Sequence, residues 1–208
     1  MKKFLTTTAL LSTMAAGTAA QAQTGSWYGS LFGGLSFGAT IDASVAGYPV
    51  DLSFEFDPGY VIGAAVGTYV SPTTRVEAEV SYAAYEGGTY TVNYAGGSYS
   101  YSLDNVEGSA TYVLGNVWFD VPTAAMAGGA PYVGGGLGMA KFDDGFEESD
   151  FALAYQIGAG VRVPMGAGAF DVGYRYKATG ELDFGDTEPV TFDSSSSSNL
   201  QVGFVTNF

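Results

Sequence analysis

Apolar and polar residues alternate at every second position in three segments of the chain. In 151–163 all odd positions are apolar, whereas the even positions are small or polar and include Gln156 and Arg162. Segments 74–85 and 168–178 alternate in the same way. Successive side chains of a β-strand point to opposite faces, so this pattern predicts strands with one apolar and one polar face.

Eight segments have the length and composition of transmembrane β-strands, which take about 9–11 residues each. They are 27–38, 58–70, 74–85, 107–120, 131–142, 151–163, 168–178 and 198–208. The first, second and fourth segments leave open which face points outward. For the fourth, the two candidate outer faces are Tyr112, Leu114 and Trp118, or Val113, Val117 and Phe119.

Long and short connections alternate between these segments. The long or acidic connections are 39–57, 86–106, 143–150 and 179–197. Two tight turns contain proline, 71–73 and 164–167, and 121–130 is longer than a turn but made of small residues. Outer-membrane barrels have long external loops and short periplasmic turns. The pattern therefore predicts an all-β fold, an eight-stranded antiparallel transmembrane up-and-down β-barrel, with acidic external loops and both termini on the periplasmic side.

The first 22 residues have the features of a secretory signal peptide. Lys2 and Lys3 precede an apolar-leaning run that ends at the small-residue site Ala20-Gln21-Ala22. This run is too short and too rich in threonine to span a bilayer as a helix, which needs about 20 apolar residues. We therefore expect a signal peptide at 1–22, export through the periplasm, and one barrel domain at 23–208.

The composition fits a surface that faces lipid. The chain has 31 Gly, 15 Tyr and 14 Phe, and only 13% of its residues are charged, well below the usual value for a soluble surface. Aromatic residues form girdles at the two membrane interfaces of outer-membrane barrels. The alternation alone also fits a soluble barrel with an apolar core. The signal peptide, the alternating connections and the last strand favour the membrane barrel.

The charge and the missing residue types exclude several functions. Removing Lys2 and Lys3 from the seven basic residues leaves five against 21 acidic ones, a formal charge of −16. Nucleic-acid binding needs a basic surface, so nucleic acid is excluded as a partner. The chain has no His and no Cys, which excludes Ser-His-Asp and Cys-His catalysis. No acidic pair stands out as a carboxylate-only active site. We expect no catalytic residue, no metal site and no cofactor, and a protein that is not an enzyme.

Seven charged residues occupy polar positions of the strands and are expected inside the barrel. They are Arg75, Glu77, Glu79, Arg162, Asp171, Arg175 and Lys177, with Asp120 as a further candidate. Unpaired charge in a narrow lumen is costly, so we expect a lumen charge network, in which Arg75, Arg162 and Asp171 pair near the periplasmic end. Eight strands enclose a space that side chains can nearly fill, which predicts a plugged lumen. The alternative is that the same residues line a narrow ion path.

The densest acidic cluster outside the predicted strands lies in the connection after the fifth strand. Its members are Asp143, Asp144, Glu147, Glu148 and Asp150. The simplest interpretation is a well-solvated surface. The alternative is weak binding of Ca²⁺ or Mg²⁺, which take oxygen ligands and could bridge the loops to anionic lipopolysaccharide. The spacing does not match an EF-hand loop.

The last predicted strand ends the sequence on an aromatic residue and has apolar residues at alternate positions. The residues on its outer face are Leu200, Val202, Phe204 and Phe208. This strand resembles the assembly signal by which the barrel assembly machinery recognises outer-membrane barrels. Such a signal has a terminal aromatic residue preceded by apolar residues at every second position.

Three further stretches, Arg75–Tyr82, Pro131–Phe142 and Tyr155–Val163, resemble small outer-membrane barrels of the family that includes the opacity-type surface antigens and the OmpA transmembrane domain. The resemblance covers the chain after residue 22. It implies an eight-stranded barrel in the outer membrane of a Gram-negative bacterium, with outer-membrane lipid, lipopolysaccharide and the assembly machinery as partners.

We expect a monomer with a structural or surface-interaction role, because members of this family serve as structural, adhesive or immunogenic surface proteins. The alternative is a narrow passive porin-like channel for ions or small solutes.

Overall fold

The structure, a computed structural model, describes residues 24–45, 50–122, 129–143, 151–180 and 190–208. Within these ranges it does not describe the side chains of residues 45, 103–106, 143 and 190–193. The predicted signal peptide at 1–22 lies outside the described residues. No helix in the described part of the chain is long and apolar enough to cross a membrane.

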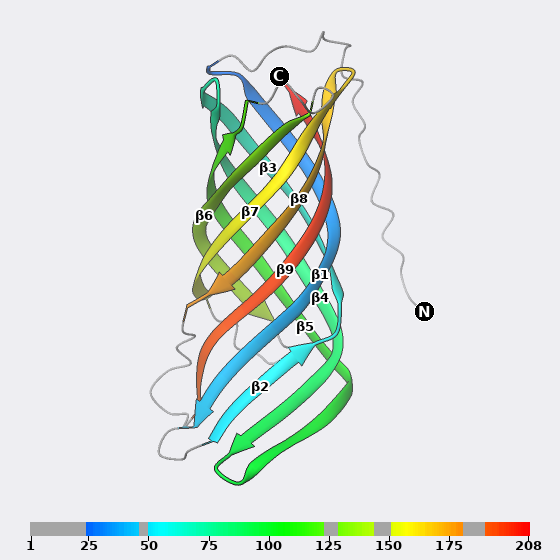
Figure 1. The fold of residues 1–208 in the computed structure, drawn as a ribbon, viewed down its shortest axis with the longest axis vertical. Helices are drawn as coiled ribbons and strands as arrows, with labels where there is room; N and C mark the ends of the chain where they lie inside the picture. Colours follow the sequence, from blue (N-terminus) through cyan, green and yellow to red (C-terminus); the bar gives the residue numbers. More distant parts are fainter. Residues whose placement is uncertain (1–23, 46–49, 123–128, 144–150, 181–189) are drawn as a thin grey trace, which may run out of the picture.

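Nine antiparallel β-strands form one closed sheet, which has the shape of a barrel (Figure 1). They are β1 (Trp27–Val45), β2 (Val50–Phe56), β3 (Gly59–Ser71), β4 (Thr74–Tyr94), β5 (Gly97–Asp120), β6 (Ala130–Asp143), β7 (Phe151–Met165), β8 (Gly168–Thr179) and β9 (Val190–Asn207). From β3 onward each strand pairs with the next one along the chain, and β9 closes the ring by pairing with β1.

The nine strands fill eight positions around the barrel. Strands β2 and β3 both pair with β1 on one side and with β4 on the other, so they are two segments of one barrel position. The interruption falls at Asp57 and Pro58, because proline has no backbone N–H to continue the ladder. The predicted class, an antiparallel outer-membrane-type barrel, is confirmed, and the strand count differs only through this interruption.

The structure decides the facing of the strands that the sequence left open. In β5, Trp118 is fully buried inside the barrel, whereas Val117 and Phe119 are exposed on its outer face. The indole N–H of Trp118 donates to Glu77 inside the barrel, and hydrocarbon could not have accepted this hydrogen bond. Tyr28 of β1 and Val61 of β3 also point inward and are buried.

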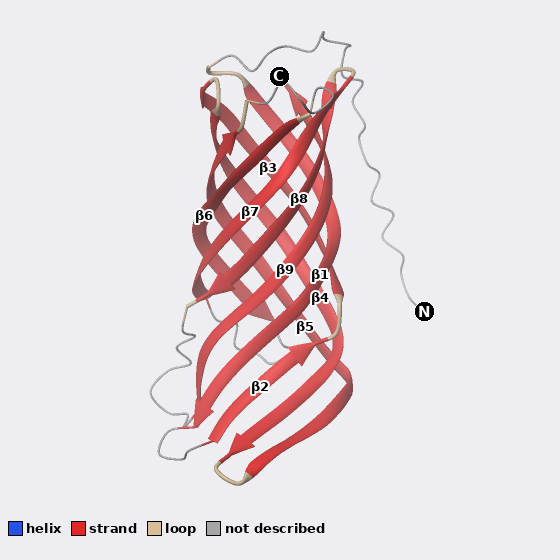
Figure 2. Cartoon of the chain, in the orientation of Figure 1, coloured by secondary structure: helices blue, strands red, loops and turns tan. Residues whose placement is uncertain are grey.

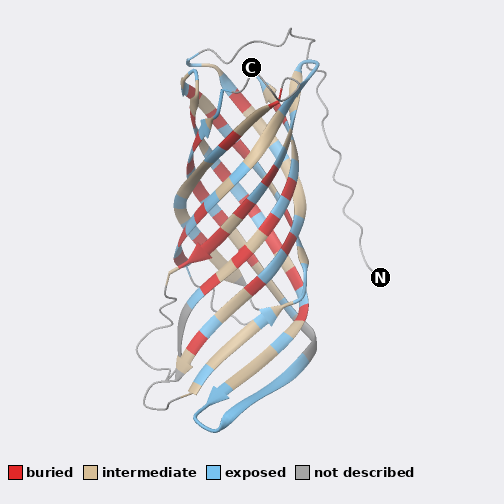
Figure 3. Ribbon diagram, viewed as in Figure 1, coloured by how far each residue is buried: buried red, intermediate tan, exposed pale blue. Residues whose placement is uncertain are grey.

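The outer face of the barrel is strongly apolar. Leu31, Leu137 and Leu153 are 70%, 66% and 66% exposed, and Figure 3 shows buried and exposed positions alternating along the strands. An exposed apolar surface that encircles the molecule is incompatible with water but suits the hydrocarbon core of a bilayer. The rings of Phe170 and Phe204 lie 6.3 Å apart on the same outer face.

The barrel is longer on one side than on the other. Strands β6, β7 and β8 end their pairing near Asp143, Phe151 and Thr179, whereas β9, β1, β2, β4 and β5 continue as a curved sheet, which we call the extension (Figures 1 and 2). It lies at the end of the barrel opposite the C-terminus.

The predictions of loops at 39–57 and 86–106 were therefore wrong in large part. The prediction for 179–197 was wrong at 190–197, which belong to β9, whereas 181–189 lie outside the described residues. The extension contains residues to Val45 of β1, the whole of β2, and the β4–β5 hairpin around Tyr94 and Gly97. These segments were interpreted as loops because they are polar. However, Thr, Tyr and Val favour strands, and a sheet with water on its convex face carries Ser, Thr and Asn without cost.

The tight approach of β5 and β6 requires glycine at one position and not at a neighbouring one. A Cβ added to Gly136 would collide with the Asn116 side chain and lie 2.6 Å from the backbone oxygen of Gly115, whereas a Cβ on Gly115 would meet its nearest atom at 3.8 Å. We expect Gly136→Ala to lower the free energy of unfolding by about 1–3 kcal/mol through overpacking, measured by denaturant titration with tryptophan fluorescence. Gly115→Ala is the matched control and should change it by less than about 0.5 kcal/mol. Equal effects of the two substitutions would contradict the close approach.

Candidate functional site: the charged interior of the barrel

Arg75 of β4 is the most extensively contacted cation in the barrel interior. It is 1% exposed. Its Nε donates to Oδ1 of Asp120 at 3.2 Å, and its Nη1 lies 3.8 Å from Oε2 of Glu77. The guanidinium also lies over the Tyr132 ring, 4.5 Å from the ring centre, and donates to the Tyr28 hydroxyl at 3.4 Å. Two carboxylates and two aromatic side chains thus compensate one buried charge.

Glu77 joins Arg75 to donors from β1 and β5. The Tyr28 hydroxyl donates to Oε2 of Glu77 at 2.8 Å. The Trp118 indole and the Asn116 amide donate to Oε1 at 3.0 Å and 3.3 Å. Hydrogen bonds to a carboxylate are stronger than those between neutral groups, so these three donors hold the Glu77 side chain in place beside Arg75.

A second ion pair joins β7 and β8. Nε of Arg162 donates to Oδ2 of Asp171 at 3.2 Å, and Nη1 of Arg162 donates to the Tyr69 hydroxyl at 3.3 Å. The Tyr132 hydroxyl donates to Oδ1 of Asp171 at 2.5 Å. Arg162 and Asp171 are directly opposite each other in the β7–β8 ladder. The register of this hairpin therefore places the two side chains next to each other.

Arg175 of β8 has no carboxylate within ion-pair distance among the described residues. It is held by two backbone carbonyls, by the Tyr132 hydroxyl at 2.8 Å, and by the Trp118 ring, whose centre lies 4.2 Å from the guanidinium carbon. The Arg175 side chain fits here because two neighbouring residues are glycines. A Cβ added at Gly158 or Gly173 would lie 2.6 Å from Arg175 atoms. Gly158 and Gly173 therefore serve packing, because they leave space for the Arg175 side chain.

Glu79 and Lys177 form the most deeply buried ion pair. Nζ of Lys177 lies 2.8 Å from Oε1 of Glu79, and the Lys177 and Glu79 side chains are 1% and 4% exposed. Lys177 also donates to the Ser81 hydroxyl, which in turn donates to Glu79 at 2.9 Å. Oε2 of Glu79 accepts hydrogen bonds from Asn116 at 3.0 Å and Gln156 at 2.8 Å. Such full satisfaction is what a buried ion pair needs in order to offset its desolvation.

The interior network is electrically balanced, although the whole chain carries a formal charge of −14. Its four cations are Arg75, Arg162, Arg175 and Lys177, and its four carboxylates are Glu77, Glu79, Asp120 and Asp171.

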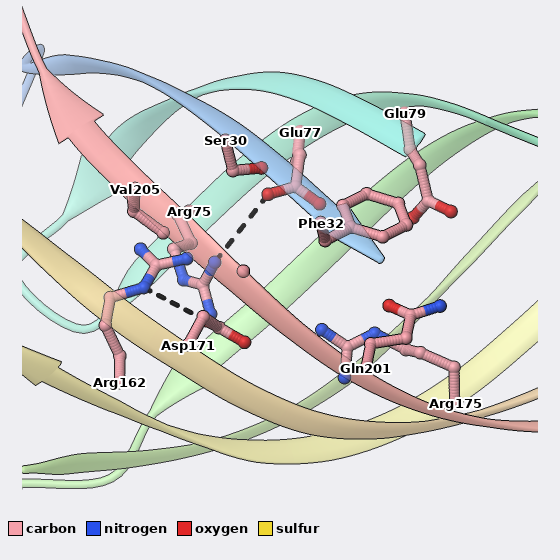
Figure 4. A pocket seen from close by; sticks show the side chains of 11 residues that line it. Ser30, Phe32, Arg75, Glu77, Glu79, Arg162, Asp171, Arg175, Gln201 and Val205 are labelled. Atoms are coloured by element: carbon pink, nitrogen blue, oxygen red, sulfur yellow. Dashed lines mark hydrogen bonds and ion pairs between the residues drawn. The ribbon is translucent and has the colours of Figure 1, made fainter. Parts of the chain in front are cut away.

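Little space remains between these side chains. A cavity of about 30 Å³ is lined by charged residues that include Arg75, Glu77 and Asp171 (Figure 4). A polar cavity of this size has room for ordered water. Arg75 Nη2 and Gln201 Nε2 are buried donors without a partner in the described residues, and both side chains line the cavity.

The structure brings together all seven charged residues that the sequence placed in the lumen, and Asp120 with them. The predicted grouping of Arg75, Arg162 and Asp171 is confirmed in part: Arg162 pairs with Asp171, whereas Arg75 pairs with Asp120 and Glu77. The neutral members of the network were not predicted from the sequence. They are Tyr28, Tyr69, Ser81, Asn116, Trp118, Tyr132 and Gln156. Asn116 and Trp118 could have been found from the sequence, because they lie on the same face of the strand as Tyr112 and Leu114.

The other predicted sites lie away from this network. The side chains of Leu200, Val202, Phe204 and Phe208 share the outer face of the last strand and are exposed there. The predicted cation-binding cluster of Asp143, Asp144, Glu147, Glu148 and Asp150 lies outside the described residues, except for the backbone of Asp143 at the end of β6. Among the side chains that are described, no group of three or more acids could hold a metal ion.

A family model for the outer membrane protein beta-barrel domain matches residues 6–208. The chain belongs to this family. Membership places it in the outer membrane of a Gram-negative bacterium. A search of curated proteins found no match.

Solved structures of low sequence identity share the fold of this family member. Neisserial surface protein A (NspA) is 18% identical with a TM-score of 0.53, covering 88% of this chain and 97% of its own. The outer membrane protein AlkL, solved in lipid bilayers, is 15% identical with a TM-score of 0.52, covering 95% and 97%. The outer membrane protease OmpT of Escherichia coli is 8% identical with a TM-score of 0.49, covering 88% and 97%. At these identities the likeness concerns the fold and not the activity.

The Glu79–Lys177 pair can be tested by removing its cation. We expect Lys177→Met to lower the free energy of unfolding by about 3–5 kcal/mol, because it leaves the Glu79 carboxylate buried without a cation. The double variant Glu79→Gln/Lys177→Met should recover most of this loss, since the introduced glutamine is neutral and keeps an oxygen for Asn116 and Gln156. The measurement is a denaturant titration of the refolded protein.

Lys141→Met is the control, because Lys141 makes no ion pair within the described residues. If the Lys177→Met variant unfolded at the same denaturant concentration as the wild-type protein, the network would not stabilise the barrel.

Proposed function

We propose that this protein is a non-catalytic barrel with a plugged lumen, exported by its signal peptide, whose role in the outer membrane is structural and surface-interactive. The observation that carries the proposal is the balanced interior network, in which four cations and four carboxylates fill the space and leave a cavity of about 30 Å³. A path for hydrated ions needs a continuous polar channel, whereas here Trp118, Tyr28 and Tyr132 lie buried among the charges.

The interior towards the extension supports the same proposal. Tyr112, Leu114 and Ala154 form a buried apolar cluster against which Phe142 packs. Tyr85, Val61 and their neighbours form a second one. An ion moving along the barrel would leave the charged layer and meet these apolar side chains, which offer little to replace its hydration. The charged residues therefore support a scaffold role better than a conducting one.

The outer surfaces support a role in contacts. The apolar belt would contact outer-membrane lipid, and Leu200, Val202, Phe204 and Phe208 present the side chains that the assembly machinery would recognise. The extension projects beyond the short strands β6, β7 and β8 (Figure 1). With the C-terminus on the periplasmic side, it would stand outside the cell among lipopolysaccharide. Weak cation binding by the acidic cluster stays a prediction.

Conductance distinguishes a plugged scaffold from the alternative, a narrow passive pore. We expect the refolded mature protein to give no reproducible current steps in a planar bilayer in concentrated KCl. Arg175→Ala should also be silent, because the Glu79–Lys177 pair and the apolar clusters stay in place. A heat-dependent shift on SDS gels would show that each sample is a folded barrel. Reproducible wild-type steps whose size changes in Arg175→Ala would overturn the plug and make the lumen a path.

A further inference from the structure

Within the described residues, the outer strand of the β4–β5 hairpin pairs with another strand on one side only. Over Gly97–Glu107, β5 pairs with β4 alone, and its pairing with β6 begins only at Ser109. No other strand in the described part of the chain lies against this stretch, and Figure 1 shows it as the outermost strand at the far end of the extension. An edge of this kind presents a row of backbone donors and acceptors that another strand can pair with.

The register shows which backbone groups point to the free side. Tyr94 and Gly97 flank the two-residue turn Ala95–Gly96 and are opposite each other, which makes them a hydrogen-bonded pair of the antiparallel ladder. Hydrogen-bonded and non-bonded pairs alternate. The backbone N–H and C=O groups of Ser98 and Ser100 therefore point away from β4, toward the open edge.

The part of the edge from Gly97 to Leu103 lacks most of the features that usually prevent strand addition, whereas Asp104, Glu107 and a register shift lie just beyond it. Natural proteins protect edges with lysine or other charges, proline, bulges or short strands. Residues 87–103 contain no charged residue and no proline, and the pairing of 88–94 with 97–103 is regular. The sequence from Ser98 to Ser102 alternates serine with tyrosine, a strand-forming pattern.

Two exposed aromatic side chains flank this edge. Tyr99 and Tyr101 are 60% and 58% exposed and share the face of the hairpin that carries Tyr90 and Tyr94. The Tyr94 and Tyr99 rings stack with centres 5.6 Å apart. Figure 3 shows the tip of the hairpin almost entirely exposed. Aromatic side chains next to a pairing edge form favourable cross-strand contacts with an added strand.

We propose that the Ser98–Tyr101 edge of β5 binds an extended segment of a separate polypeptide, which adds as a further strand to the extension. The backbone groups of Ser98 and Ser100 supply hydrogen bonds that only another peptide backbone matches in series, and Tyr99 and Tyr101 contact its alternate side chains. The chain carries a formal charge of −14, and Glu86 and Glu107 lie opposite each other, both exposed, at the base of the hairpin. The segment is therefore neutral to basic. This inference rests on the proposed surface-interaction role.

The test uses a peptide of defined sequence. The probe copies Thr89–Tyr94, which already pairs with the other side of β5, and carries a lysine at each end. Its fluorescent form is titrated with the full mature protein in detergent micelles, where binding depends neither on orientation in a membrane nor on conductance. If the probe did not bind, the proposal of a plugged barrel would be unaffected. If the lumen conducted ions, the binding result would be unaffected.

The decisive variant is Ser100→Pro with Ser100→Ala as its matched control. Both lose the hydrogen bond between the Ser100 and Thr91 hydroxyls, but only proline removes the N–H that points to the free edge and places its ring there. We expect Ser100→Ala to bind like the wild-type protein and Ser100→Pro to bind at least about tenfold more weakly. The heat-dependent gel shift checks that both variants fold.

A second control leaves the protein unchanged. A probe whose backbone is N-methylated at alternate residues cannot form the ladder and should not bind, and a probe flanked by glutamates should bind more weakly. Equal binding of the methylated and unmethylated probes, or of the two Ser100 variants, would overturn the edge as the site. A wild-type dimer that Ser100→Pro converts to a monomer would assign the edge to a second copy of this chain and overturn the separate partner.

Discussion

Closure of the backbone hydrogen-bond ladder is the constraint on which the rest of this structure depends. In hydrocarbon no water is present to satisfy N–H and C=O groups, so a sheet can cross a bilayer only when its last strand pairs with its first. Here β9 pairs with β1 from Tyr28 to Val45. Closure with eight positions fixes a narrow interior. Every inward side chain must then be small, or must find its partner inside the barrel.

The interior network follows from that narrowness. Charges placed on inward positions have little access to water, so each needs a counter-charge or several hydrogen-bond partners within a few ångströms. The barrel supplies them from different strands: Glu79 of β4 meets Lys177 of β8, and Arg75 of β4 meets Asp120 of β5. Because these contacts cross the lumen or join neighbouring strands, they tie the two sides of the barrel together, and the glycines of β6, β7 and β8 give them room.

Much of this arrangement could be predicted from the sequence, and the parts that could not have definite physical reasons. Alternation fixed the facing of 74–85 and 151–163, because charge and apolar residues there are cleanly separated. It failed for 107–120, where both faces are apolar: Trp118 and Val117 look equivalent until the acceptor of the Trp118 indole, Glu77, is known. Pairing inside the lumen could be predicted only in part. The pair of Arg162 and Asp171 was expected and is present. The partners of Arg75 were not, because many charged residues share the inner face and the distances between them depend on strand register and side-chain rotamers.

The extension was missed for a different reason, and that reason explains its nature. A transmembrane strand can be recognised in a sequence by its apolar outer face, because that face contacts lipid. Once the strands pass beyond the level at which β6, β7 and β8 end, the outer face no longer contacts lipid, and residues such as Thr91 and Ser100 replace leucine and valine there. The same change removes the requirement for closure, because water can satisfy an open edge. Only beyond the bilayer can this barrel leave one side of β5 without a neighbouring strand, as it does around Ser98 and Ser100 within the described residues. The place where the sequence pattern of the barrel fades is therefore also where its backbone becomes available to another chain.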